Sequence, residues 1–294
     1  MEVKAKSKNL KIKVPNTTAF KFKTSNDLPK LHQNCIFVGA RGSGKGVAMS
    51  NMIRMFQQDG NMDRVLCISP TFLSNKEILK DLKIDPEDVF DPDDKECIQK
   101  IRDIVQGEVN DLEQYRSEIK LYQQFQKKLE SSDFISDDML ESFYRDGDFK
   151  PPEHRWGGRE PVLALIVDDC QGSDLFRNRK FQNMVIRHRH EGQFKKGGAL
   201  GLSLFICVQS YKAQNGCPRS IRNNVTSLVL FKTKDKKTLD EISEEVAGEI
   251  APELFMEVYE RAVQGEHDFL FIDLHKKPEH LSMFRRNFDT FLTI

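Results

Sequence analysis

This sequence of 294 residues lacks several features that would assign it to a particular class of protein. No apolar run approaches the roughly 20 residues that a helix needs to cross a bilayer, and the N-terminus lacks the apolar centre of a secretory signal. The formal net charge is zero, so a surface for nucleic acid has to be a local patch rather than a property of the whole molecule. We therefore expect no membrane partner.

The six cysteines form no C-x-x-C pair, which argues against a structural zinc site. Cys35, Cys67, Cys170 and Cys207 lie in short apolar runs, where a free cysteine acts as a small hydrophobic residue. Cysteines that serve as buried hydrophobic residues favour a reducing, intracellular compartment.

Short apolar runs alternate with stretches of helical spacing along most of the chain. Apolar runs of this length, separated by helices, are typical of a parallel sheet that is buried on both faces. We therefore predict an α/β fold with a mostly parallel central sheet flanked by helices. Its strands are expected at 34–39, 64–69, 161–169, 202–210 and 227–232, with a terminal hairpin from 267–274 and 280–287.

Two segments differ from this core. Residues 1–30 are predicted to form a basic N-terminal arm, and residues 31–294 to form the main domain. Within that domain, residues 81–160 carry 22 Asp and Glu against 12 Lys and Arg, with apolar residues at helical spacing. We predict an acidic helical insertion there, a hairpin laid on the core that carries no chemistry.

The segment GARGSGKG follows an apolar run and precedes an amphipathic stretch. The pattern G-x-x-x-x-G-K in this context predicts a phosphate-binding loop for ATP, in which backbone N–H groups and a helix N-terminus bind phosphate. The lysine would supply its charge to the β- and γ-phosphates. The residues expected to contact the nucleotide are Gly39, Ala40, Arg41, Gly42, Ser43, Gly44, Lys45, Gly46 and Val47.

The loop departs from the usual pattern at Gly46. A Ser or Thr at this position normally supplies a hydroxyl group to Mg²⁺. Ser43 and Ser50 are poorly placed to replace that hydroxyl, but a water can take the position, because Mg²⁺ keeps several waters.

Three polar residues follow buried strands. Asp168 and Asp169 end the most apolar run of the chain, and Gln209 ends the next one. The carboxyl ends of parallel strands lie beside such a loop, so we assign Asp168 to Mg²⁺ and Asp169 to the attacking water. Gln209 would reach the γ-phosphate or that water. A capping role remains open for Asp169 and for Gln209.

Residues 177–222 carry ten Lys and Arg against a single acidic residue, Glu191. A one-sided basic segment in a neutral protein suits the phosphate backbone of DNA, although a solvated helix face is the usual explanation of a charge run. The candidate DNA-binding residues are Arg187, His188, Arg189, Lys195 and Lys196.

The ordered segments GARGSGKG, LIVDDC, RHRH, LFICVQS and CPRSIRNNVTSLVLFK resemble those of the genome-packaging ATPases of the FtsK–HerA superfamily. This family occurs in poxviruses, other large DNA viruses, virophages and related elements. The resemblance covers roughly residues 30–275. It implies a RecA-like P-loop NTPase core, ATP and Mg²⁺ as cofactors, and translocation of double-stranded DNA into a viral capsid.

The resemblance also implies partners and further site residues. A homo-oligomeric ring of five or six subunits is expected, together with capsid proteins, at a cytoplasmic or nuclear assembly site of an infected cell or on the virion. Gln209 corresponds to the family's sensor. Arg222, ahead of Arg219, is the candidate for a catalytic arginine finger that acts on a neighbouring subunit.

Two alternatives belong to other classes. Small-molecule kinases such as adenylate kinases also read GKG, but they continue with Thr where Val47 stands here, and they give the basic segment and Gln209 no role. A non-hydrolysing P-loop protein, acting as a structural ring or adaptor, would have little need of Lys45, Asp168 and Asp169 together.

Overall fold

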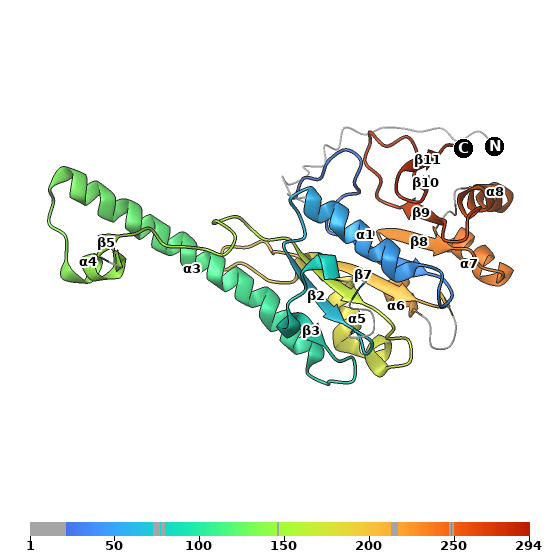
Figure 1. The fold of residues 1–294 in the computed structure, drawn as a ribbon, viewed down its shortest axis with the longest axis horizontal. Coiled ribbons are helices and arrows are strands. Elements are labelled where there is room, and N and C mark those ends of the chain that lie inside the picture. Colours follow the sequence, from blue (N-terminus) through green and yellow to red (C-terminus); the bar gives the residue numbers. More distant parts are fainter. Residues whose placement is uncertain are drawn as a thin grey trace, which may run out of the picture.

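The computed structural model describes residues 22–72, 77, 80–145, 147–212, 217–246, 248 and 250–294. Its central feature is a sheet in the order β11-β10-β9-β8-β1-β7-β6-β2-β3, in which nine strands are described (Figure 1). The strands are β1 (Asn34–Val38), β2 (Arg64–Ile68), β3 (Val89–Phe90), β6 (Leu163–Val167), β7 (Ser203–Val208), β8 (Ser227–Phe231), β9 (Phe269–Asp273), β10 (Phe284–Arg286) and β11 (Thr290–Leu292).

The strands from β8 to β3 run parallel, and β9, β10 and β11 continue the sheet antiparallel at one edge. β7 lies between β1 and β6, with Phe37 opposite Cys207 and Phe205 opposite Ile166. The predicted strands and the terminal hairpin are therefore confirmed, as is the α/β fold class with its mostly parallel central sheet.

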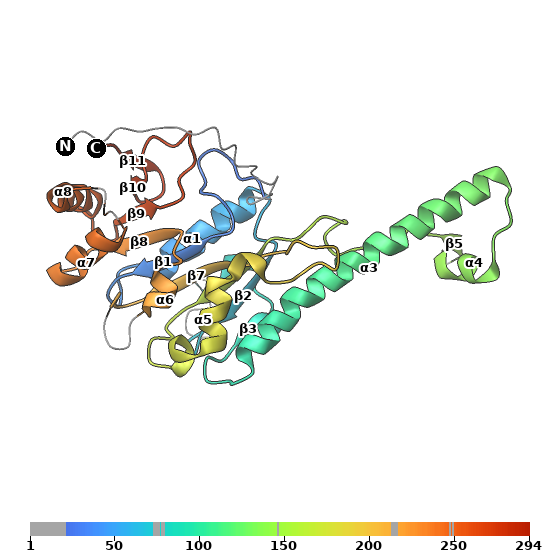
Figure 2. The ribbon, with the colours of Figure 1, turned by 180° about the vertical axis from the view of Figure 1, so that it is seen from behind.

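Helices cover both faces of the sheet, so its strands are buried on both sides (Figures 1 and 2). One face packs on α1, and the other packs on the first half of α3 and on the helices that follow β6. The helices are α1 (Lys45–Gln58), α3 (Cys97–Ser131), α4 (Asp137–Phe143), α5 (Arg179–Ile186), α6 (Arg219–Arg222), α7 (Lys236–Val246) and α8 (Pro252–Ala262). Short 3₁₀ turns are η1 (Lys80–Leu82), η2 (Pro86–Asp88), η3 (Asp174–Arg177) and η4 (His188–His190).

All six cysteines are buried and free. Their side chains fill the interior as the composition suggests.

The acidic insertion is helical, but the prediction of a hairpin laid on the core is wrong. Ile98, Ile101 and Val105 of α3 pack on the sheet, and the second half of this helix projects away from the domain (Figure 1). The chain returns at the tip through α4 and a two-stranded ribbon of β4 (Tyr144–Arg145) and β5 (Asp148–Phe149). We call the part of the chain from 113 to 150 the arm.

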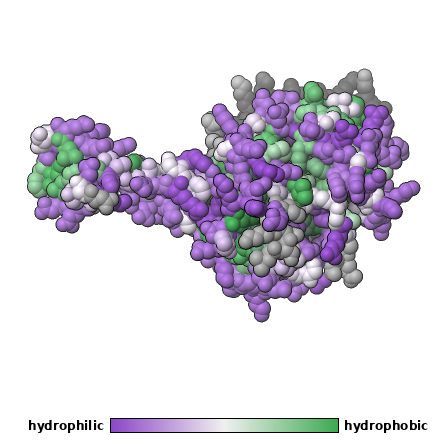
Figure 3. Space-filling model, in the orientation of Figure 1, coloured by the Kyte–Doolittle hydropathy of each residue, from purple (hydrophilic) through white to green (hydrophobic). Residues whose placement is uncertain are grey.

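The tip of the arm has its own apolar cluster. Its apolar side chains are therefore buried without contact with the core of the domain. Tyr122, Phe125 and Phe143 are buried against one another there. Apolar residues also reach the surface of the tip (Figure 3), among them Phe134, which is 84% exposed. The apolar periodicity of α3 therefore belongs to two separate clusters, one where the helix packs on the sheet and one at the tip.

A polar cluster fixes α3 where it leaves the sheet. The buried carboxylate of Glu108 accepts hydrogen bonds from Arg64 Nη1 at 2.8 Å and from Trp156 Nε1 at 2.6 Å. Arg64 also binds Asp88, with 2.7 Å between Nη2 and Oδ1. The single tryptophan of the chain therefore anchors the base of the arm.

Residues 1–21 of the predicted N-terminal arm lie outside the described residues. Residues 22–30 lie against the terminal hairpin. Lys277 Nζ donates to the Thr24 carbonyl at 3.0 Å, and Arg285 Nη1 donates to the Asp27 carbonyl at 2.7 Å. Within the described part of the chain, no helix has the length and apolar character to cross a membrane.

Candidate nucleotide-binding site

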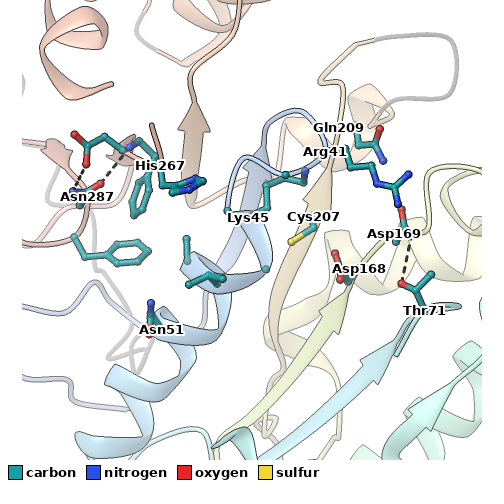
Figure 4. A pocket seen from close by; sticks show the side chains of 18 of the residues that line it. Arg41, Lys45, Asn51, Thr71, Asp168, Asp169, Cys207, Gln209, His267 and Asn287 are labelled. Carbon is teal, nitrogen blue, oxygen red and sulfur yellow. Dashed lines mark hydrogen bonds between the residues drawn. The ribbon is translucent and has the colours of Figure 1, made fainter. Parts of the chain in front are cut away.

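A pocket of about 960 Å³ opens at the carboxyl edge of the parallel strands (Figure 4). Because β1, β6 and β7 are parallel, the residues that follow them meet at this edge. Lys45, Asp168, Asp169 and Gln209 all line the pocket, so the structure brings these predicted residues together. Arg41, Gly42, Gly44, Gly46 and Val47 of the predicted loop line it as well.

The loop has the backbone that its glycines allow. Gly42 and Gly44 have φ values of 79° and 103°, in the left-handed region that other residues avoid. A Cβ on Gly39 would lie 2.8 Å from Cβ of Phe231, so no larger residue fits there. Helix α1 starts directly after Gly44, so its first N–H groups, which have no acceptor within the helix, lie next to the loop. Such a loop can hold a polyphosphate.

Lys45 folds back onto the loop. Its Nζ donates to the carbonyl oxygens of Gly39 at 2.7 Å and Ala40 at 2.9 Å. Burial lowers the pKa of Lys45, and the charges of Asp168 and Asp169 oppose that shift. The ammonium group is thus already partly removed from water, and bound phosphate oxygens would offer it a stronger partner than two carbonyls.

Asp168 is half-buried below the loop and contacts a residue that sequence reasoning did not assign to the site. Burial raises the pKa of Asp168, the charge of Asp169 raises it further, and a hydrogen bond with Cys207 opposes both. Cys207 lies between Lys45 and Asp168 (Figure 4), and burial raises the pKa of its thiol well above the ordinary value. Its place near the end of β7, two positions before Gln209, is the signal that could have revealed it.

Asp169 differs from its neighbour because it is exposed and has a φ of 55°. Its Oδ2 accepts a hydrogen bond from Thr71 Oγ1 at 3.5 Å. The left-handed backbone turns the chain sharply after β6, so that the two adjacent carboxylates occupy different parts of the pocket. This arrangement suits one carboxylate near a metal and another near a water.

Gln171 connects the segment after β6 to the segment after β7. Its Oε1 accepts a hydrogen bond from the Gln209 backbone N–H, and its Nε2 donates to the Ser210 carbonyl at 3.1 Å. Gln171 also lines the pocket, and nothing in the sequence pattern indicated it. The position of Gln209 therefore depends on the loop that carries Asp168 and Asp169.

The residues fit ATP with Mg²⁺ only if the nucleotide itself supplies metal ligands. No group of three or more His, Cys, Asp and Glu side chains among the described residues could hold a metal. Gly46 offers no side-chain ligand. Asp168 would hold Mg²⁺ together with phosphate oxygens and waters, which is how this ion is usually bound beside a nucleotide.

The predicted DNA-binding residues lie elsewhere. The Leu202 N–H donates to the His188 carbonyl at 2.8 Å just before β7 begins, so η4 lies at the amino edge of the sheet, opposite the pocket. Arg187 and Lys196 are exposed. Arg189 is half-buried. Lys195 is exposed and lies beside the arm, with its Nζ 3.9 Å from Glu113 Oε2.

His188 is a correction to the predicted set. Its side chain is buried, and its Nδ1 lies 2.9 Å from the Val185 carbonyl oxygen. Burial lowers the pKa of His188 to about 4, so the ring is neutral at physiological pH. A buried, neutral imidazole offers DNA neither a charge nor an accessible donor.

Arg222 is also placed differently from the prediction. Its side chain is only 10% exposed, its Nη2 lies 3.2 Å from Glu245 Oε1, and its guanidinium stacks over Tyr211 at 5.2 Å. These contacts hold it within its own chain. Arg219, on the same short helix, is exposed. The geometry therefore favours Arg219 over Arg222 for a contact with a neighbouring chain.

No family model and no curated protein matches this chain. It is similar to solved structures, among them the genome packaging NTPase B204 from Sulfolobus turreted icosahedral virus 2 with ATP-gammaS. That match has 12% identity over 87% of this chain and 97% of that chain, with a TM-score of 0.43. The pCW3 conjugation coupling protein TcpA matches with 17% identity over 88% of this chain and 63% of that one, with a TM-score of 0.42. The Thermomonospora curvata type VII secretion ATPase EccC matches with 15% identity over 85% of this chain and 25% of that chain, with a TM-score of 0.38. The likeness is one of fold.

The raised pKa of the half-buried Asp168 leads to a prediction on stability. Because its pKa is raised in the folded protein, its charged form costs stability above that pKa and the cost disappears as the pH falls through it. Asp168→Asn should therefore raise the thermal unfolding midpoint of the nucleotide-free protein at pH 7, and the gain should shrink on acidification. Asp169→Asn, at an exposed position, is the control and should show no such gain. Equal midpoints of Asp168→Asn and wild type at pH 7 would contradict this account.

Proposed function

We propose that this chain is an ATP-hydrolysing motor that moves double-stranded DNA into a viral capsid as a homo-oligomeric ring. The observation that carries the ATPase part is the shared pocket, where a glycine loop with Lys45 faces Asp168, Asp169 and Gln209. A phosphate site alone would not need two carboxylates and an amide at the end of the phosphate chain. Hydrolysis does need them, because the charge that develops must be balanced and the attacking water must be oriented.

Each residue then has a separate task. Lys45 would bind the β- and γ-phosphate oxygens in place of the carbonyls of Gly39 and Ala40. Asp168 would hold Mg²⁺, which supplies positive charge to the phosphates when bound. Asp169, which is exposed beside Thr71, would orient that water and accept its proton. Gln209 would contact the γ-phosphate end and report on it through Gln171.

The DNA part rests on the basic segment and on the family resemblance of the ordered motifs. Arg187 and Lys196 are exposed, and Arg189 is partly so, at the edge of the sheet opposite the pocket. Cations at that edge can contact the DNA backbone without blocking entry of nucleotide. The separation also means that nucleotide chemistry and DNA contact occur at opposite ends of the same parallel strands.

A nucleotide-binding structural or adaptor protein is the second candidate, and Gly46 favours it. The missing hydroxyl removes one ligand of Mg²⁺, which can allow binding without turnover. Steady-state ATPase measurements with Mg²⁺ separate the two, because the adaptor binds nucleotide and releases no phosphate.

The first test of the motor measures phosphate release with and without double-stranded DNA. We expect hydrolysis that DNA stimulates, and no hydrolysis by Lys45→Ala, since the β- and γ-phosphates lose their cation. Asp169→Asn should keep ATP binding and lower kcat by about 10²-fold or more, as expected for loss of a general base. Wild-type kcat in Asp169→Asn would remove this residue from the mechanism.

The second test concerns the DNA surface. Replacing Arg187 and Arg189 together by Gln should weaken binding to all DNA sequences alike and reduce the slope of log K against log salt by up to about two. The double replacement of exposed Lys236 and Lys237 is the matched control and should leave the slope unchanged. If the Arg187/Arg189 variant keeps the wild-type slope, the basic segment is only a solvated surface.

The third test asks whether Arg219 acts on the site of a neighbouring subunit. Arg219→Ala and Lys45→Ala should each be inactive, with the arginine variant about 10³-fold slower than wild type. Mixed assemblies should regain activity, because an intact loop can meet an intact arginine. Arg222→Ala is the comparison and should mainly lower stability, since it breaks the contact with Glu245. Mixed rings that stay inactive would exclude a shared site at Arg219.

A further inference from the structure

The pocket continues beyond the phosphate loop into a region that none of the proposed steps uses. On the side of Lys45 away from Asp168, it is lined by residues at the ends of β9 and β10 (Figure 4). These residues are His267, Asp268, Phe269, Asn287 and Phe288. His267 Nδ1 lies 3.3 Å from the Ser43 carbonyl oxygen, so the terminal hairpin directly adjoins the loop.

The direction of a bound nucleotide follows from the two ends of the pocket. In the proposed function the γ-phosphate lies toward Asp168, Asp169 and Gln209, and the loop surrounds the phosphate chain. The nucleoside must then extend the other way, toward the terminal hairpin. The volume of about 960 Å³ is near the upper end of ligand pockets and leaves room for more than a triphosphate.

An aromatic wall stands on that side. The ring of Phe288 lies 4.8 Å from that of Phe269 and 5.5 Å from that of Phe271, centroid to centroid. The Phe288 carbonyl accepts a hydrogen bond from Arg285 Nη1 at 3.1 Å, which fixes its backbone. Phe288 is only half-buried by these contacts and it lines the pocket, so part of its ring is available to a flat ligand.

Beside the wall stands a carboxylate in a fixed orientation. Asp268 Oδ2 accepts a hydrogen bond from the Gly265 N–H at 2.9 Å, and Oδ1 accepts one from Asn287 Nδ2 at 3.0 Å. These two bonds hold the pKa of Asp268 below its ordinary value, so it is ionised at neutral pH. An ionised carboxylate accepts hydrogen bonds and cannot donate them, and each oxygen keeps a lone pair for a ligand.

We infer that the terminal hairpin forms the nucleobase subsite of this pocket and that it selects a base with an exocyclic amino group, such as the adenine of ATP. Phe288 provides the apolar surface against which the base stacks, and Asp268 accepts a hydrogen bond from the exocyclic amino group. A base with a carbonyl oxygen at that position, such as hypoxanthine, places an acceptor against the carboxylate and is rejected. The inference rests on the proposed binding of a nucleoside triphosphate.

Equilibrium binding of ATP, ITP and inorganic tripolyphosphate tests this subsite. Wild type should bind ATP roughly tenfold or more tightly than ITP, because a charge-assisted hydrogen bond is replaced by a repulsion. Asp268→Asn should bring the ATP/ITP ratio close to one, since an amide can turn its NH₂ toward a carbonyl. Phe288→Ala should weaken ATP and ITP roughly tenfold and leave tripolyphosphate unchanged, because only the base is stacked.

Two control variants match these changes outside the pocket. Asp289→Asn alters an exposed carboxylate on the same turn, and Phe134→Ala removes an exposed aromatic ring from the arm. Both should bind all three ligands as wild type does. Thermal unfolding shows whether each variant is folded. If Asp268→Asn does not fold, the binding of ATP and tripolyphosphate by Phe288→Ala still tests the subsite.

The outcomes separate this inference from the proposed function. Equal binding of ATP and ITP by wild type, or unchanged ATP binding by Phe288→Ala, would overturn the adenine subsite while tripolyphosphate binding upholds the phosphate loop. Failure of wild type to bind tripolyphosphate and both nucleotides would overturn the proposed function, and the subsite with it.

Discussion

Parallel hydrogen bonding of β7 to both β1 and β6 is the constraint on which the site depends. The pairing aligns Val38 with Val208 and Val167 with Ile206, so all three strands end at nearly the same level. The loop after β1, the carboxylates after β6 and the amide after β7 are thereby held within one pocket. No side chain has to be long to reach the phosphate chain. A slip of one residue in the pairing of β6 with β7 would turn Cys207 away from Asp168, because successive side chains of a strand point to opposite faces.

Residues whose role is decided by local sequence could be predicted, and residues whose role is decided by distant partners could not. The loop at 39–46 and the strand that ends before Asp168 are recognisable because glycine spacing and continuous apolar runs are local signals. The burial of His188 depends on its packing near the start of β7, and the side chain of Arg222 depends on Glu245, 23 residues later. A run such as RHRH looks uniformly solvated until the tertiary structure buries one of its members.

The terminal hairpin shows the same limit at the scale of an element. Its two strands were expected from their apolar pattern, but their contribution to the pocket was not. Asp268 and Asn287 come together only because β9 and β10 pair antiparallel, with Leu270 opposite Arg286. In the arm, the secondary structure could be predicted but its packing could not. Its apolar period correctly indicates a helix, yet periodicity carries no information on whether one cluster or two will bury the apolar side.

The geometry of α3 has a mechanical consequence. A helix of 35 residues is about 52 Å long, and only its first part is attached to the sheet. Beyond the Glu108 cluster, Glu113 accepts a hydrogen bond from the Lys195 N–H at 2.9 Å and Arg116 binds Glu160 at 3.0 Å, so the attachment of the helix to the domain ends at Arg116. From Ser117 to Ser131 the free part of the helix spans about 21 Å, so a tilt of about 10° at Arg116 carries its end through about 4 Å. Displacements too small to rearrange the core therefore become displacements of a side-chain length at the far end of the arm.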